Sequence, residues 1–449
     1  MKSNNFFQNL YKITYLVLGF ILILFFQNCS AESFRVKGVG LDNLVSNSED
    51  LNSQLDVPII PRPNDDVPRI GISLPEEESA INVTTTATTT GKIYYVSISG
   101  NDANPGTLAK PFKTIARGSK VLASGDTLLI RAGTYNEVME AGFNGFVFRN
   151  GKSKTAMTRY AAYLTEKVVV KAPVGRAYVV QLKSNSYIEI SGLVFDGTNA
   201  TSYAVKFDEY SINNRLLRNE LVYGRMGIAG GAMNEIIGNR IHHMKAYGIY
   251  TGGDNGLLEG NTFHDNGGYA IHHFQQNKTV NNWVFRNNIF YRNGRGYYWG
   301  GTDFRKAPAV IISRGKNNKF YNNILYDNNA GIFVGYGAVD TLVANNTVYR
   351  NDTNGIDVNS AHSGSINARI INNLVWANKS SQITNNATNT TLKTNLTTDP
   401  KVVSPGVNFR LQSSSPAINK GTTLVEVPKD FLGVSRPRGS AYDIGAYEY

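Results

Sequence analysis

Short apolar stretches recur through the middle of the chain, and each follows an asparagine. The pattern is Asn, any residue, an apolar residue and then usually an aromatic residue or histidine. Its copies are residues 219–222, 239–242, 261–264, 288–291, 323–326, 346–349 and 373–376. They recur every 20 to 35 residues, an interval that suits coils of three short strands joined by turns. The third position is always apolar, so we expect it to point inward, because strand side chains alternate between faces.

A second repeated element supports the same coil. A Gly-Ile or Ala-Ile pair places its isoleucine nine or ten residues beyond the Asn, at Ile228, Ile249, Ile271, Ile332 and Ile356. Asparagine is dense, with nine between Asn317 and Asn351, and its amide can bond to the Asn one coil away. These features predict an all-β fold, a right-handed parallel β-helix, in which equivalent residues stack about 4.8 Å apart.

The apolar pattern changes near the two ends of the chain. We expect a short N-terminal capping helix within residues 111–123, with Pro111 in its first turn. Residues 92–160 are expected to hold this cap and the first strands, residues 161–395 the coils, and residues 396–449 a C-terminal capping segment. Caps are expected because open sheet edges promote aggregation.

The first 91 residues have a different composition. Residues 1–30 read as an export signal, with Lys2 and Lys12 before an apolar run that is short for a membrane span. Cys29, the one cysteine of the chain, follows that run and is the predicted site of lipidation. The alternative is cleavage after Ala31 and free secretion. The proline-rich residues 31–91 are predicted to form a disordered tether, so an outer-membrane or cell-surface lipoprotein is expected, and otherwise a secreted protein.

Charge separates the tether from the repeats. The whole chain carries +11, whereas residues 92–449 hold 39 basic and 24 acidic side chains, a net charge of +15. A basic, exported domain favours polyanionic partners. We therefore expect an acidic polysaccharide as the partner, a membrane contact through the N-terminal lipid, and no nucleic acid.

Several short motifs resemble known proteins. Tyr94-Tyr95-Val96-Ser97, the Pro111-Phe112 pair and the segment 131–135 (Arg-Ala-Gly-Thr-Tyr) resemble the opening of bacterial pectin-lyase-like β-helix proteins. The ending, with residues 443–447 (Asp-Ile-Gly-Ala-Tyr), resembles the C-terminal segment of such exported proteins. The resemblance covers residues 92–449 and implies the fold. It does not imply an activity, because this superfamily includes lyases, hydrolases, epimerases and adhesins.

The motifs of the enzymes in this superfamily match poorly. The resemblance to calcium-dependent pectate lyases implies an Asp-rich cluster, and the chain has only separate acidic candidates. The segment 269–273 (Tyr-Ala-Ile-His-His) is similar in spacing to a mannuronan epimerase motif, without its Asp and Pro. Calcium stays a possible cofactor, and the metal ligands are unknown.

Histidines and aromatic residues provide the candidate chemistry. His242 and His264 share a column with four aromatic residues, which favours a stabilising stack over a sugar platform. The column after the Gly-Ile pairs is chemically mixed and is expected to face outward, with Ile312 assigned to the coil that carries an insertion. There Tyr250 and His272 are expected to be adjacent, about 4.8 Å apart, as acid–base partners. Lys206 is a further candidate base, and plain solvent exposure of the column is the alternative.

The long interval before residue 323 indicates an inserted loop near residues 294–307. Its Tyr297 and Trp299 could stack on sugar rings, while Arg295 and Arg305 could pair with carboxylates. A hydrophobic flap is the equal alternative. Asp357 completes the predicted substrate-binding residues.

Two functions remain open from the sequence. The first is a lyase that cleaves a uronic-acid-containing polysaccharide by β-elimination, with His272, Tyr250 or Lys206 as the proton acceptor. In that case loss of the His272 side chain is expected to abolish cleavage. The second is a non-catalytic glycan-binding rod or adhesin, with a sugar epimerase as a weaker possibility.

Overall fold

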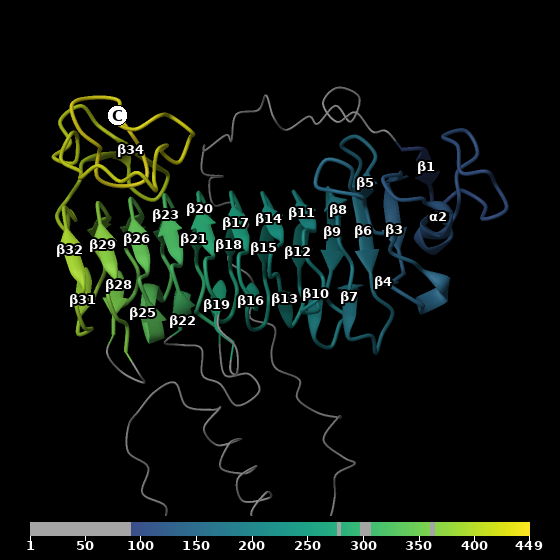
Figure 1. Cartoon of the computed structure of the whole chain (residues 1–449), viewed down its shortest axis with the longest axis horizontal. Helices are drawn as coiled ribbons and strands as arrows, with labels where there is room; N and C mark the ends of the chain where they lie inside the picture. The colour runs from purple at the N-terminus through teal and green to yellow at the C-terminus, as the bar shows by residue number, and fades with distance from the viewer. Residues whose placement is uncertain (1–90, 276–279, 297–306, 360–363) are drawn as a thin grey trace, which may run out of the picture. The chain divides into compact units, whose positions relative to one another are not determined.

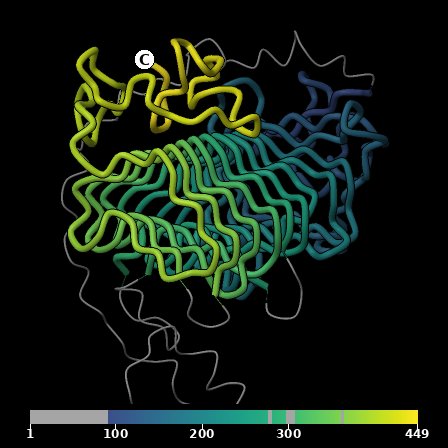
Figure 2. Tube along the Cα trace, turned by 60° about the vertical axis from the view of Figure 1, so that its left-hand side comes forward, coloured from purple at the N-terminus to yellow at the C-terminus, as the bar shows by residue number. Residues whose placement is uncertain are grey.

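The computed structural model describes residues 91–275, 280–296, 307–359 and 364–449, and these form a right-handed parallel β-helix (Figure 1). Three parallel sheets run along it, here called sheets A, B and C, with twelve, ten and ten strands in the described part. The chain passes from A to B to C in each coil, and the coils lie side by side (Figure 2). Among these residues, no helix is both long and apolar enough to span a membrane.

The strands are short in all three sheets. Sheet A contains β1 (Ile93–Val96), β2 (Thr127–Ile130), β5 (Thr158–Ala162), β8 (Ile188–Ser191), β11 (Arg215–Leu217), β14 (Glu235–Ile237), β17 (Leu257–Glu259), β20 (Val284–Arg286), β23 (Lys319–Tyr321), β26 (Leu342–Ala344), β29 (Arg369–Ile371) and β32 (Thr391–Lys393). Sheet B contains β3 (Gly133–Tyr135), β6 (Val168–Lys171), β9 (Leu193–Asp196), β12 (Glu220–Val222), β15 (Arg240–His242), β18 (Thr262–His264), β21 (Ile289–Tyr291), β24 (Ile324–Tyr326), β27 (Thr347–Tyr349) and β30 (Leu374–Trp376). Sheet C contains β4 (Met139–Glu140), β7 (Tyr178–Leu182), β10 (Tyr203–Phe207), β13 (Met226–Gly230), β16 (Ile249–Thr251), β19 (Ile271–His273), β22 (Pro308–Lys316), β25 (Ala330–Val339), β28 (Ile356–Val358) and β31 (Ile383–Asn385).

The interior is built from the predicted inward positions. The third position of each Asn repeat is fully buried, and Phe263 and Phe290 stack with ring centroids 5.2 Å apart. The isoleucines of the second element pair in register on sheet C, as Ile228 does with Ile249. Burial of such a continuous apolar column is the main driving force for the solenoid.

The predicted asparagine ladder is present at the turn between sheets A and B. The Asn239 amide donates to the Asn261 Oδ1 at 3.0 Å, and the same bond links Asn261 to Asn288. Each Oδ1 also accepts the backbone N–H of the previous Asn, at 2.9 Å for Asn239. Each buried Asn amide of the ladder therefore has hydrogen-bond partners in the next coil, which offsets the free energy lost when a polar group leaves water.

The predicted N-terminal helix is α2 (Ile115–Val121), followed by the short 3-10 turn η2 (Phe143–Gly145). The Thr114 hydroxyl caps α2 by accepting from the Arg117 N–H at 3.0 Å. Pro111 was wrongly placed in the first turn, because the helix begins four residues later at the Thr114 cap.

The C-terminal segment contains the hairpin β33 (Val402–Ser404) and β34 (Asn408–Leu411), and it packs along the side of the last coils (Figure 1). The Phe409 ring lies 5.4 Å from Tyr326 and 6.1 Å from Trp376, both on the outer face of sheet B. The last strand of sheet A, β32, is exposed along its length. The predicted export signal, Cys29 and the tether up to residue 90 lie outside the described residues.

Candidate functional site

Sheet C presents one row of outward-facing side chains, here called the sheet C row. In order along the sheet they are Gln181, Lys206, Ala229, Tyr250, His272, Ile311, Phe333, Asp357 and Thr384. The expected position of Ile312 was wrong by one residue, because Ile312 pairs with His273 and points into the core. The row therefore brings the three predicted catalytic residues onto one face, with the small Ala229 between Lys206 and Tyr250.

His272 is enclosed by aromatic rings. Its ring lies perpendicular to Tyr250 with centroids 4.9 Å apart, which confirms the predicted contact. Tyr247 and Tyr269 lie 5.1 and 4.9 Å away, and Phe274 stacks at 5.6 Å. Burial lowers the pKa of His272 to about 4, and its buried Nδ1 has no hydrogen-bond partner among the residues that the structure describes. At neutral pH the imidazole is therefore uncharged.

Lys206 lies half-buried at the other side of Ala229. Its Nζ is 5.5 Å from the centre of the Tyr203 ring, a cation–π distance. Burial lowers the pKa of Lys206, and the nearby Asp208 carboxylate opposes that shift. The lysine is thereby shifted towards the neutral amine, which is the form that can accept a proton.

The pKa of the Tyr250 phenol is shifted upward, in contrast to the downward shift of the Lys206 pKa. Burial, followed by the neighbouring phenols of Tyr203 and Tyr247, raises the pKa of Tyr250 to about 12, while Arg314 opposes the shift. The guanidinium of Arg314 also lies 5.1 Å from the centre of the Phe274 ring. Tyr250 is therefore protonated at neutral pH, and it can donate a proton to a bound group more easily than accept one.

The remaining predicted residues lie apart from this group. Asp357 is in the same row but three strands beyond His272, where its Oδ1 accepts from the Thr384 hydroxyl at 2.8 Å. Arg295 forms an ion pair with Asp352 at 2.7 Å. Tyr297, Trp299 and Arg305 lie outside the described residues.

Similarity to known proteins agrees with this architecture. Family models match residues 178–302 as "Right handed beta helix region" and residues 98–147 as "Protein of unknown function (DUF1565)". Pectate lyase L of Dickeya dadantii is 23% identical over 408 residues, covering 81% of this chain and 92% of the relative. The crystal structure of pectate lyase Pel9A aligns with a TM-score of 0.56 at 21% identity, covering 80% of this chain and 96% of that one. The chain has the pectin-lyase-like fold.

A further relative of this pectin-lyase-like chain is an uncharacterized protein of Bacillus subtilis (strain 168), YwoF. It is 25% identical over 335 residues, which cover 64% of this chain and 69% of the relative. A mannuronan C5-epimerase of Pseudomonas putida is 33% identical over 114 residues, covering 23% of this chain and 20% of the relative.

Sequence reasoning missed a second column in this pectin-lyase-like fold. Tyr203, Tyr247 and Tyr269 each precede the Gly or Ala of the sheet C repeat, and they surround the predicted residues. Extending the alignment of the Gly-Ile pairs by one residue towards the N-terminus would have found them. Two neighbouring arginines could not be found in this way, because neither lies in a repeated sequence position. The charge of Arg225 opposes the rise in the pKa of Tyr203, and that of Arg314 opposes the rise in the pKa of Tyr250.

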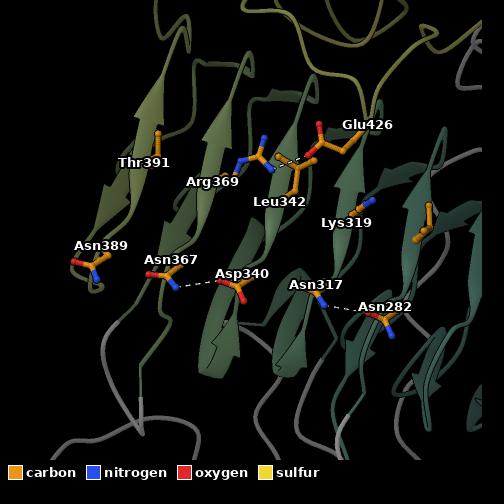
Figure 3. Close-up of a pocket in the computed structure, with 11 residues that line it drawn as sticks. Asn282, Asn317, Lys319, Asp340, Leu342, Asn367, Arg369, Asn389, Thr391 and Glu426 are labelled. Carbon is orange, nitrogen blue, oxygen red and sulfur yellow. Dashed lines mark hydrogen bonds and ion pairs between the residues drawn. The ribbon is translucent and has the colours of Figure 1, made fainter.

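A polar hollow of about 760 Å³ lies on a different sheet, sheet A, near the C-terminal segment (Figure 3). Its lower edge is a row of turn residues, in which Asn317 donates to Asn282 at 3.3 Å and Asn367 donates to Asp340 at 3.0 Å. An ion pair of 2.8 Å between Arg369 and Glu426 spans the upper side. None of the predicted site residues within the described ranges line this hollow.

Proposed function

We propose that this protein binds an acidic polysaccharide across the outer face of sheet C and cleaves it by β-elimination. The observation that carries the proposal is the sheet C row, in which a lysine with lowered pKa and a protonated tyrosine flank the small Ala229. The net charge of +15 over residues 92–449 favours a polyanion. The similarity to Pectate lyase L over most of both chains supports this substrate class.

The proposed chemistry begins at the carbon next to the uronate carboxylate. Lys206 takes the proton from that carbon when its amine is in the deprotonated form, which its lowered pKa favours. The carbon–hydrogen electron pair forms a carbon–carbon double bond, and the bond to the glycosidic oxygen breaks. Tyr250 gives its proton to that leaving oxygen, since its raised pKa keeps it protonated. Arg225 and Arg314 stabilise the negative charge that develops at the carboxylate.

His272 has a positioning role in this proposal. Its ring contacts Tyr250 and Tyr269 and is shielded by them, so it holds the phenol in place. This differs from the direct proton transfer expected from the sequence.

Calcium fits the described residues poorly. Calcium binds several oxygen ligands, whereas the one close group of three or more metal-ligating side chains in the described part is His242, His243 and His264.

The deciding experiment incubates the protein with a panel of acidic polysaccharides and follows the ultraviolet absorbance of the unsaturated uronate that β-elimination forms. We expect a rise with one polymer and no need for added calcium. Chain shortening without this absorbance would indicate hydrolysis, and altered sugar stereochemistry without shortening would indicate an epimerase. Either result would overturn the lyase proposal.

Binding without cleavage is the second candidate, and the enclosure of His272 by four aromatic rings favours it. Aromatic faces bind sugar rings without any need for an acid or base. A polymer that is retained in a pull-down at full length, with a flat absorbance trace, would support this candidate.

We also propose that the chain is exported and attached to the cell surface through lipid on Cys29. Cell fractionation should then find the protein with membranes, and Cys29→Ser should release it into the soluble fraction. A soluble protein before the substitution would contradict the anchor and support free secretion.

A further inference from the structure

Two adjacent turns between sheets B and C place four ligand-type side chains on a grid. His242 ends β15 and His243 begins the turn after it, and their Nδ1 atoms are 2.7 Å apart. One coil away, His264 ends β18 and Asp265 follows it, with Nδ1 and Oδ2 also 2.7 Å apart. His242 stacks on His264 with centroids 4.5 Å apart and planes within 7°.

The backbone makes this grid regular. His242 and His264 are register partners on sheet B. His243 and Asp265 follow them, both with left-handed backbone at φ 56° and 54°. Equivalent backbone conformations in stacked coils project equivalent side chains in the same direction. One ring nitrogen from each of the three histidines consequently lies within 4.8 Å of the other two, with a carboxylate beside them.

The surrounding hydrogen bonds resemble the support of a metal site. Glu220 lies 2.9 Å from the Nε2 of His242, and a carboxylate there keeps the proton on Nε2. The Nδ1 of His242 then accepts a hydrogen bond from the Nδ1–H of His243, and His243 has to move that proton to its Nε2 before both Nδ1 atoms can bind an ion. Histidine ligands commonly donate their other N–H to a carboxylate in this way, which fixes the tautomer and orientation of the ring.

Two arginines compete with a metal ion for the same atoms. Arg240 donates its Nε–H to the Nε2 of His264 at 3.0 Å and also contacts Glu220 at 3.3 Å. Arg292 binds both oxygens of Asp265 at 2.7 Å. For a cation to enter, Arg240 has to turn fully towards Glu220, so that His264 can carry its proton on Nε2 and offer Nδ1.

We propose that His242, His243 and His264, with Asp265, form a binding site for a divalent transition-metal ion of the zinc type. Three imidazoles and one carboxylate match the ligands that zinc prefers, and they are poor ligands for calcium or magnesium. Closing the grid around an ion requires Arg240 to turn away from His264, Arg292 to release one Asp265 oxygen, and the exposed His243 to rotate.

The site has a consequence for the sheet C face. The first turn leads in seven residues from His243 to Tyr250, and the second leads in seven residues from Asp265 to His272. An ion shared by both turns ties together the two coils that carry these rings. It acts as a positioning and stabilising clamp, and the proposal holds whether or not the protein cleaves polysaccharide.

The test is calorimetric titration of the full-length chain with zinc chloride, in a Cys29→Ser background that removes the one thiol. We expect one zinc ion per chain and a rise in the thermal unfolding midpoint with zinc. Magnesium chloride should give neither effect. Absence of zinc binding would overturn the proposal.

Variants locate the ion within the chain. His243→Asn keeps a residue that tolerates left-handed backbone and should weaken binding by about tenfold or more. Asp327→Asn is the matched control, because Asp327 has the same left-handed backbone as Asp265 at the equivalent position two coils further on, and it should leave binding unchanged. Arg240→Gln should strengthen binding, because it removes a competing donor from His264. Unaltered zinc affinity in His243→Asn, or weaker affinity in Arg240→Gln, would place the ion elsewhere and overturn the assignment.

Discussion

Sheets B and C both carry an outward row rich in aromatic rings, but the C-terminal segment covers part of the sheet B row, whereas residues of the sheet C row keep partial exposure. On sheet B the aromatic part of the row is His242, His264, Tyr291, Tyr326, Tyr349 and Trp376. Its later members are packed beneath the C-terminal segment, where Tyr326 is 5% and Trp376 is 6% exposed. On sheet C, Lys206, Tyr250 and Asp357 keep partial exposure among the described residues.

The difference shows that an outward aromatic row can become either an exposed surface or a buried interface, depending on whether another segment packs on it. Rows of this kind become core when a later segment covers them, as Phe409 covers sheet B through contacts of 5.4 to 6.1 Å. From His242 to Trp376 the sheet B row contains only aromatic rings, because stacking requires only similar rings. The sheet C row mixes a lysine, an alanine, a tyrosine and a histidine, which stacking does not require.

The largest effect is expected from Lys206 on sheet C. Lys206→Met keeps the aliphatic stem but removes the amine, and we expect cleavage to fall by about 10²–10⁴-fold, the usual contribution of a general base. The rate of product absorbance measures this. Lys393→Ala, on an exposed strand of sheet A, is the control and should keep full activity. If Lys206→Met also kept it, the amine would not be the base.

The corresponding change on sheet B should affect stability alone. Phe409→Ala removes the ring that contacts Tyr326, Tyr349 and Trp376, and we expect a loss of about 3–5 kcal/mol from the unfolding free energy of the region that includes the C-terminal segment. Urea unfolding followed by tryptophan fluorescence measures it. The control is Val425→Ala, whose side chain is 86% exposed and should change stability by less than about 0.5 kcal/mol. An equally small change in Phe409→Ala would show that the segment is not held by this contact.

These two rows also show what the sequence could and could not predict. The inward columns and the Asn ladder follow from a repeat in which equal positions share one chemistry, so their structure was predictable. The cover over Tyr326 was not, because Phe409 lies 83 residues along the chain in a segment without the repeat. The contact between Tyr250 and His272 followed from register, whereas the burial of His272 depends on turn residues Tyr247 and Tyr269, which the pattern left unassigned.

A smaller effect should separate a base from a positioning residue at His272. The fold lowers the pKa of His272 from 6.5 to about 4, so it stabilises the neutral form. That stability is fully present above about pH 6.5 and is lost as the pH falls towards 4, by about 1–3 kcal/mol. His272→Phe keeps an aromatic ring and should make stability less sensitive to acid over this range, as measured by urea unfolding at several pH values.

The same variant tests the catalytic role. A positioning ring can be replaced by phenylalanine with much of the activity kept, whereas a proton acceptor cannot. Activity that disappears in His272→Phe, with the fold intact by circular dichroism, would restore the direct role expected from the sequence.

The smallest effect is expected from single hydroxyl groups, one on each row. Tyr250→Phe removes the proposed proton donor and keeps the ring against His272, so turnover should fall by about tenfold while substrate affinity changes little. Tyr349→Phe makes the same change on sheet B, where the ring packs on Trp376 at 4.6 Å and the hydroxyl has no proposed chemistry. Steady-state kinetics of the two variants measures the comparison directly. Equal turnover in both would mean that the sheet C row binds its polymer through ring faces, as the sheet B row binds Phe409, and that the proton donor lies elsewhere.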